Sequence, residues 1–340
     1  MTDDLIGRPA ADYRPRRERR PVGRWILAVL AVLALAGVIV AAPWDEGRRQ
    51  AYADQWVVWT DPPTAQIESL ADDLALTEAG RRIFFATRPQ IETARDFEAH
   101  CPVEADVVLG CYYRGRIFVY DVTDERLAGT VESTSAHELL HAYYDRLDAA
   151  EATRIDALVA DYVSTIPADD ATLAIVESYP ASQRADEWHS RLGTTFPSLP
   201  AALELHYAQV FDDRQRIVEF DSASRAQIDG YNARIEQLST ELDAASADLT
   251  ARSAAYDADI AALNADISTF NERADAGEFS SQSDFDRERA AIIARQDALE
   301  AQRIALNADV DAYNAKVAEL TTLDSERAEL YEHLDSHSAP

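Results

Sequence analysis

The chain has 340 residues, a formal net charge of −29 at neutral pH and a hydrophobic content of 47%. The negative charge argues against nucleic-acid binding, which needs a basic surface, and the hydrophobic content excludes wholesale disorder. The length suggests about two domains. Of the 13 prolines, all but Pro340 lie at or before Pro200, so the C-terminal part is predicted to be helical, because helix interiors exclude proline.

The N-terminal segment predicts a single-pass membrane anchor. Residues 25–42 are eighteen residues without a polar side chain, at the lower end of what crosses a bilayer core of about 30 Å. Six arginines between residues 14 and 24 precede this run, whereas acidic residues follow it. Residues 1–24 are therefore predicted to be a basic cytoplasmic tail, and the chain after the anchor to be extracytoplasmic. The alternative is a cleaved signal peptide, since residues 40–42 are small.

Farther along the chain, residues 106–122 have the pattern of a β-hairpin. Residues 106–113 alternate in hydrophobicity toward a turn at Arg114-Gly115, and residues 116–122 are typical of the returning strand. We therefore expect an α+β extracytoplasmic domain that is mostly helical and contains a small antiparallel sheet.

Cys101 and Cys111 are the two cysteines of the chain. In an oxidising compartment, the default for such a lone pair is a disulfide, which would pin the start of the predicted β-hairpin. The alternatives are two free thiols, or a metal site that includes His100.

His137, Glu138 and His141 form an HExxH motif. Residues four apart share one face of a helix, so the two histidines can present their imidazoles to a single zinc ion. Zinc lowers the pKa of a bound water to about 7, and Glu138 is placed to take a proton from that water as it attacks a carbonyl. Ser133 or Thr134 is expected to cap this helix. The alternative is a surface helix that carries two histidines by chance.

The motif and the strand that precedes it, residues 116–122, resemble the zincin metallopeptidases. The resemblance implies a zincin-like fold and the hydrolysis of peptide bonds. It also implies that His137 and His141 are zinc ligands, that Glu138 is the general base, and that the preceding strand lies beside the substrate peptide.

A zincin site needs a third protein ligand. The metzincin subgroup is excluded because positions 144 and 147 are Tyr and Leu, where its motif requires Gly and His. The gluzincin subgroup takes a Glu from a later helix, and we predict Glu187 for this role. Asp145 or Asp161 is a candidate to orient a ligand histidine. The other candidates for the third ligand are Glu177, Glu151 and Glu204.

Glu187 is preferred because it lies in the middle of a predicted short helix, residues 182–192, which can aim its side chain rigidly. Ser182 is expected to cap this helix and Gly193 to stop it. His189 shares the helix, and we predict that it stabilises the oxyanion formed during hydrolysis. The alternatives for that role are Tyr207 and His206.

The C-terminal third predicts an antiparallel coiled-coil hairpin. Apolar residues recur at steps of three and four over residues 228–270, interrupted at Arg252, and again over residues 292–334. Gly277 is expected to end the first helix, and Ser283 or Asp284 to cap the second.

Together these features predict a membrane-anchored, extracytoplasmic zinc metalloendopeptidase. Its metallopeptidase domain would span residues 50–212 and its coiled-coil hairpin residues 213–335, with Zn²⁺ as cofactor and a peptide or protein as substrate. The alternative is a non-catalytic envelope scaffold, in which the domain is a fold remnant and the hairpin binds an envelope protein. In a third hypothesis, the hairpin is a gate or lid for the substrate. The presence of Glu138 favours an enzyme.

Overall fold

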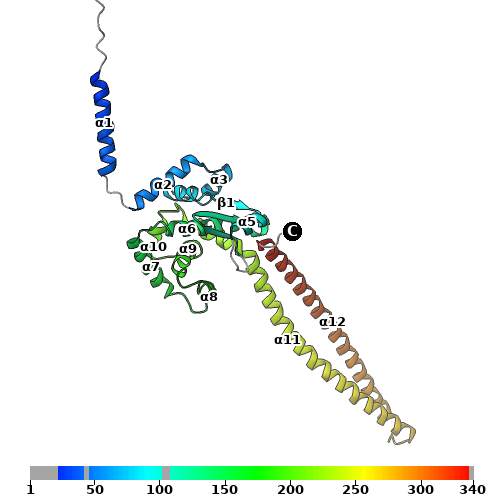
Figure 1. Cartoon of the computed structure of the whole chain (residues 1–340). Helices are drawn as coiled ribbons and strands as arrows, with labels where there is room; N and C mark the ends of the chain where they lie inside the picture. Colours follow the sequence, from blue (N-terminus) through cyan, green and yellow to red (C-terminus); the bar gives the residue numbers. More distant parts are fainter. Residues whose placement is uncertain (1–21, 42–45, 102–107, 337–340) are drawn as a thin grey trace, which may run out of the picture. The chain divides into compact units, whose positions relative to one another are not determined.

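The computed structural model describes residues 22–41, 46–101 and 108–336, which fall into two compact units divided after Arg49 (Figure 1). The first unit contains helix α1 (Val22–Ala41). Residues 1–21 and 42, which belong to the predicted basic tail and the end of the anchor, lie outside the described residues.

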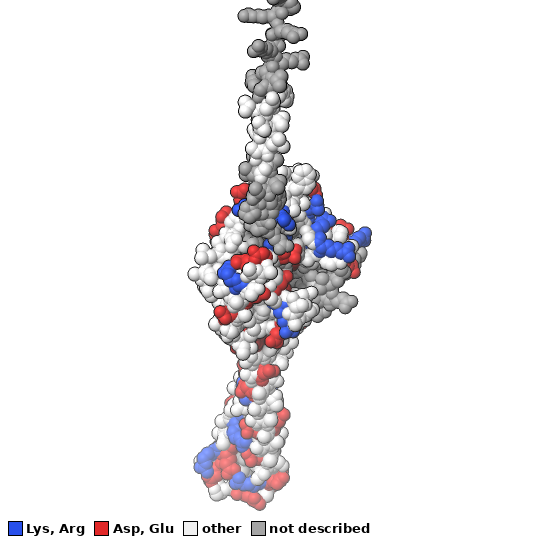
Figure 2. Space-filling model, turned by 60° about the vertical axis from the view of Figure 1, so that its left-hand side comes forward, with Lys and Arg blue, Asp and Glu red and all other residues white. Residues whose placement is uncertain are grey.

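Helix α1 is apolar along most of its length, and its described large apolar side chains are exposed. In the space-filling view, its described residues carry no charged side chains (Figure 2). However, none of the helices in the described part of the chain is long and apolar enough to cross a membrane. The membrane-spanning part of the prediction is therefore not confirmed.

The second unit contains a three-stranded sheet with the strand order β1-β3-β2. Strands β2 (Gly110–Tyr113) and β3 (Arg116–Tyr120) form the predicted antiparallel hairpin. Strand β1 (Gln90–Glu92) pairs with β3 in parallel, because helix α5 (Ala94–His100) carries the chain back after β1. The sheet is therefore mixed, and the prediction of a purely antiparallel sheet is wrong.

The turn of the β-hairpin lies at Arg114 and Gly115, as predicted. Both residues have positive φ angles, 52° and 76°, which suit the right-handed twist of the two strands. The sulfur atoms of Cys101 and Cys111 lie 1.94 Å apart and form the predicted disulfide between the end of α5 and strand β2. Residues 102–107 between them, including the first part of the predicted strand, lie outside the described residues.

Helices surround this sheet, and several begin at the cap residues that favour helix starts. A Thr or Asp side chain accepts a backbone N–H at the N-terminus of four of them, at Thr64, Thr77, Asp148 and Asp170. The helices of the second unit before the long hairpin are α2 (Glu46–Thr60, which begins in the first unit), α3 (Ala65–Asp73), α4 (Glu78–Ala86), α5, the 3₁₀ helix η1 (Glu125–Leu127), α6 (Thr130–Tyr144), α7 (Ala149–Val163), α8 (Ala171–Ser178), α9 (Arg184–Thr195) and α10 (Ala201–Tyr207).

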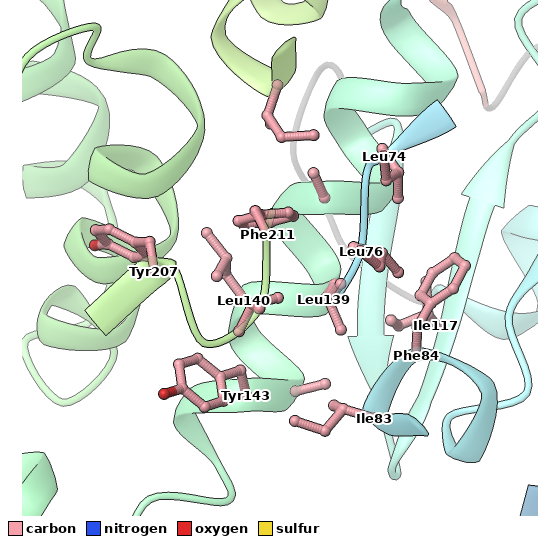
Figure 3. Close-up of a cluster of buried hydrophobic side chains, with 14 of the residues drawn as sticks. Leu74, Leu76, Ile83, Phe84, Ile117, Leu139, Leu140, Tyr143, Tyr207 and Phe211 are labelled. Atoms are coloured by element: carbon pink, nitrogen blue, oxygen red, sulfur yellow. The ribbon is translucent and has the colours of Figure 1, made fainter. Parts of the chain in front are cut away.

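Helix α6, which carries the HExxH motif, runs through the hydrophobic core (Figure 3). Its Leu139 and Leu140 are fully buried, in a cluster with side chains from α4, β3 and α10. Burial of each such side chain contributes roughly 1.5–3 kcal/mol. At 100° per residue, His137 and His141 lie on the opposite side of the helix from Leu139, so burial of Leu139 turns the two histidines toward the other side of α6.

Helix α6 begins earlier than predicted. Its N-cap is Gly129, which has a φ of 92°, and not Ser133 or Thr134. A Cβ atom at Gly129 would lie 2.6 Å from the carbonyl oxygen of Phe220 in helix α11 (Arg214–Asp275). The close approach of that helix, together with the left-handed backbone, explains why the helix starts at a glycine.

Helices α11 and α12 (Gln282–Leu334) lie side by side and form the predicted hairpin (Figure 1). Gly277 follows the first helix with a φ of 67°, as expected for a helix stop. The N-cap of α12 is Ser281, whose hydroxyl accepts the N–H of Asp284, so the predicted caps at Ser283 or Asp284 are wrong. Arg252, which interrupts the apolar repeat, forms an ion pair with Asp309 at 2.8 Å.

Both ends of the hairpin belong to the core of the second unit. In the first turn of α11, Ile217 is fully buried in the main hydrophobic cluster. At the end of α12, Leu330 and Leu334 pack against Leu127, and the Ser336 hydroxyl donates to the Val108 carbonyl at 2.7 Å. The hairpin is therefore continuous with the domain at its two ends.

Candidate metal site

Helices α6 and α9 bring together His137, His141 and Glu187, three side chains that could hold a metal ion. The Nε2 atoms of the two histidines lie 3.1 Å apart. The Oε2 atom of Glu187 lies 3.7 Å from Nε2 of His137 and 3.5 Å from Nε2 of His141. The structure thus groups both motif histidines with Glu187, the carboxylate that the sequence favoured.

The spacing of these three atoms suits zinc. A point equidistant from the corners of a triangle with sides of 3.1, 3.5 and 3.7 Å lies about 2.0 Å from each corner. Zinc binds histidine nitrogen and carboxylate oxygen at about 2.0–2.2 Å. The donor set, two imidazoles and one carboxylate, is also one that zinc accepts, and it leaves a fourth position open.

The other candidates for the third ligand lie elsewhere. Glu177 is exposed on α8. Glu151 accepts hydrogen bonds from Arg154, and Glu204 accepts them from Arg214.

Helix α9 differs in its boundaries from the predicted short helix. Ser182 does not cap it, since the N-cap position is Gln183, and Gly193 does not stop it, since the helix continues to Thr195. Gly193 has a different role, because a Cβ atom there would lie 2.3 Å from Cδ1 of Leu140 on α6. This glycine allows α9 to approach α6 closely enough for the three donors to meet.

Two further side chains of α9 lie against the three candidate ligands. Oδ1 of Asp186 lies 2.9 Å from Nδ1 of His141, on the side of the ring away from Glu187. The Nε of Arg191 donates to Oε1 of Glu187 at 2.5 Å, which leaves Oε2 facing the histidines. The sequence interpretation missed both residues, although an acid directly before Glu187 and an arginine four residues after it were visible signals.

The residues predicted to orient a ligand histidine do not do so. The carboxylate of Asp145 accepts the hydroxyl of Tyr112 at 3.0 Å, and Asp161 is exposed. Asp186 takes the role that was assigned to them.

The charges of the site are strongly coupled. Burial acts to raise the pKa of Glu187, but the two histidines and Arg191 outweigh it and lower that pKa well below its usual range. Burial lowers the pKa of His141, but Asp186 and Glu187 outweigh it and raise it to about 10. Metal binding must therefore displace a proton from His141, so the metal affinity is expected to fall as the pH falls.

Glu138 is on the motif helix α6, and its side chain faces strand β2 at the edge of the sheet. Its side chain is 6% exposed, and its carboxylate accepts the backbone N–H of Tyr112 on β2. A Cβ atom at Gly110 would lie 2.9 Å from Cγ of Glu138, so only a glycine leaves room for this carboxylate. Burial is the main cause that raises the pKa of Glu138, whereas the charges of His141 and His137 act to lower it.

The strand beside this carboxylate is β2 and not β3. The prediction placed residues 116–122 next to a substrate, but β3 pairs with β1 on one side and β2 on the other. Strand β2 is an edge strand, and the N–H of Tyr112 points away from β3 toward Glu138. The strand next to the metal group is therefore β2, and its outward N–H at Tyr112 is already bonded to Glu138.

His189 is in the core and does not face the site. Its side chain has no exposed surface, and its Nε2 lies 2.9 Å from Nε2 of His206. Tyr207 is also fully buried and donates its hydroxyl to the carbonyl of His189 at 2.7 Å. All three side chains are buried in the core, so the oxyanion role predicted for His189, and for Tyr207 and His206 as alternatives, does not fit the structure.

Tyr179 lies beside the metal group instead. It follows α8, is partly buried, and its hydroxyl is hydrogen-bonded to Arg191. Burial and then the negative charge of Glu187 raise the pKa of this hydroxyl, with a smaller contribution from Glu138. Tyr179 is thus a neutral hydroxyl close to both carboxylates, and the sequence interpretation did not single it out.

The buried pair of His189 and His206 makes a pH dependence of stability predictable. Burial lowers the pKa of His206 to about 4, whereas a histidine in the unfolded chain titrates near 6.5. Below that pH the unfolded state takes up a proton that the folded state rejects, so stability is lost as the pH falls toward 4. The loss from His206 should reach roughly 2 kcal/mol at pH 5.

His206→Gln removes this titration, so its free energy of unfolding should fall less between pH 7 and pH 5 than that of the wild type. Urea unfolding at both pH values, with a chelator present so that metal release adds nothing, measures the difference. Parallel pH profiles for the two proteins would contradict the prediction.

Comparison of the chain with protein-family models, with curated proteins and with solved structures finds no match.

Proposed function

We propose that the protein is a zinc-dependent endopeptidase that acts outside the cytoplasm. The observation that carries the proposal is the group of His137, His141 and Glu187, whose donor atoms surround a point at zinc-binding distance, next to Glu138. A metal site that served only structure would have no need for a buried carboxylate beside the open position.

The residues around the metal group have distinct roles in this proposal. The substrate backbone lies along β2, which brings its scissile carbonyl next to Glu138. Zinc, when bound, lowers the pKa of water and polarises the carbonyl. Glu138 takes the proton of the attacking water and passes it to the leaving amine, and its hydrogen bond from Tyr112 holds it in position. Tyr179 donates its hydroxyl to the developing oxyanion.

The proposed location is the outer side of the cell membrane. The disulfide between Cys101 and Cys111 supports an oxidising compartment. The arginines before residue 25 and the apolar run over residues 25–42 support an anchor with a cytoplasmic N-terminus. The hairpin of α11 and α12 is available in this arrangement to bind an envelope protein.

The proposal is tested by metal analysis of the purified full chain together with two matched variants. Glu187→Ala should lose stoichiometric zinc, because two imidazoles alone do not hold zinc firmly against solvent. Glu177→Ala, an exposed glutamate ten residues away in sequence, should bind as much zinc as the wild type. A wild-type chain that binds no zinc, or that binds zinc and hydrolyses no peptide from a diverse library, would refute the enzyme and favour a scaffold.

A third variant tests the oxyanion role. Tyr179→Phe removes a hydroxyl that touches Arg191 and keeps the ring, so zinc binding should remain at one ion per chain. The kcat of peptide hydrolysis should fall by about 10²–10³, as for other single oxyanion donors, with a smaller change in KM. An unchanged kcat would show that Tyr179 only packs beside the site.

A further inference from the structure

Helix α2 exposes three large aromatic side chains on one face. Tyr52, Trp56 and Trp59 are 69%, 65% and 72% exposed. Their spacing of four and then three residues places them within about 60° of one another around the helix axis. They form a continuous aromatic stripe, which we call the α2 aromatic face.

The opposite face of α2 is fixed to the domain. Asp54, on that face, is 4% exposed and forms two hydrogen bonds with Arg146, at 2.9 and 3.0 Å. Gln50 also donates to Asp54 at 3.0 Å. The buried ion pair fixes the rotation of α2 about its axis. The fold therefore directs the aromatic face away from the domain.

The ion pair also links α2 to the metal site. Arg146 follows the motif helix directly, and its guanidinium donates to the carbonyl of Ala142 at 2.7 Å. It also lies 3.5 Å from the hydroxyl of Tyr112, the residue whose N–H holds Glu138. Whatever surface covers the aromatic face is therefore held in a fixed relation to the proposed active site.

The chemistry of the face matches the surface of a lipid bilayer. Tryptophan and tyrosine combine an apolar ring with a polar N–H or O–H, and they gather at the boundary between lipid tails and water. In the proposed function an apolar anchor precedes α2, since α1 ends five residues upstream and its described large apolar side chains are all exposed.

We propose that Tyr52, Trp56 and Trp59 insert into the headgroup region of the membrane and seat the metal-site domain on the bilayer surface. This inference rests on the membrane location in the proposed function, and not on hydrolysis. A helix of this kind lies in the plane of the interface, with its apolar face buried by about 5–10 Å.

Tryptophan fluorescence tests whether the α2 aromatic face inserts into the membrane. The full chain is reconstituted in vesicles of phosphatidylcholine and phosphatidylglycerol. The chain has five tryptophans, at positions 25, 44, 56, 59 and 188. One variant replaces Trp25, Trp44 and Trp188 with Phe, so that only the aromatic face reports. The matched control keeps only Trp188, which packs against the hydrophobic core.

Lipids that carry bromine near the headgroup end of their acyl chains should quench the first variant strongly, because bromine quenches only indoles close to it and an interfacial helix places its apolar face about 5–10 Å deep. The control with Trp188 alone should keep its fluorescence, and acrylamide in the water should quench the first variant less with vesicles than without.

Two results would overturn the inference. A chain that floats with the vesicles but shows no quenching by brominated lipid would show that water or another protein covers the face. A chain that does not float with the vesicles would refute the membrane location as well. Neither readout depends on zinc or hydrolysis. The experiment can therefore refute membrane insertion of the aromatic face without bearing on the proposed peptidase activity.

Discussion

Replacement of Glu138 with Gln is expected to leave zinc bound while peptide hydrolysis falls by about 100-fold or more. Gln has nearly the same volume, and its amide oxygen can still accept the N–H of Tyr112, so the contact with β2 survives. The variant loses the group that takes a proton from water, and it keeps all three metal ligands. Zinc content per chain and initial rates on the best peptide of a library measure the two effects.

The histidine variants are the control for this experiment, which separates zinc binding from catalysis. His137→Ala and His141→Ala each remove a ligand, so both should lose zinc and activity together. If Glu138→Gln lost its zinc as well, the residue would belong to the ligand set. If it kept full activity, the general base would lie elsewhere and the proposed chemistry would be wrong.

Gly193→Ala is expected to damage the fold and the metal site at once. The added methyl would lie 2.3 Å from Cδ1 of Leu140 and 2.8 Å from Cε1 of Tyr207, both of which are fully buried. The Tyr207 ring cannot move freely because its hydroxyl is bonded to the His189 carbonyl. Overpacking of this kind costs about 1–3 kcal/mol, and relief requires α9 to move away from α6.

Such a movement separates Glu187 from the two histidines, so zinc affinity should fall together with the unfolding temperature. Gly230→Ala is the matched control, because a Cβ atom there meets nothing within 4 Å in the interior of α11. That substitution should be neutral or stabilise the protein by up to about 1 kcal/mol. Thermal unfolding with and without added zinc compares the two, and equal behaviour would contradict the close contact at Gly193.

Features that depend on local periodicity could be predicted from the sequence. The four-residue spacing of His137 and His141 puts them on one face of any helix. In the structure, their Nε2 atoms lie 3.1 Å apart. The apolar repeats of α11 and α12 predict two helices, and Gly277 predicts the break between them, whatever the rest of the chain does. The turn at Arg114-Gly115 and the disulfide belong to the same class, because the residues involved are close in sequence.

Helix ends were predicted less well, because neighbours from other elements decide them. Ser133 and Thr134 are good caps, but α11 packs so closely at Gly129 that the motif helix starts there. Gly193 has the residue type of a helix stop, but α6 packs against it and the helix continues. In both cases a glycine serves the approach of a helix that is distant in sequence.

The sequence by itself determined that the two histidines share a helix face with Glu138 beside them, and that two long helices form the C-terminal hairpin, since each feature depends on residues that are close in sequence. Only the tertiary structure decided which glutamate joins the histidines, that Asp186 and Arg191 hold the ligands, and that β2 is the edge strand. It also placed His189 in the core, and brought Tyr179 beside the carboxylates. These relations depend on the packing of α9 against α6 and on the order of strands, which are contacts between segments tens of residues apart. Local patterns carry no information about such contacts, because the free energy that selects them comes from burial summed over the whole domain.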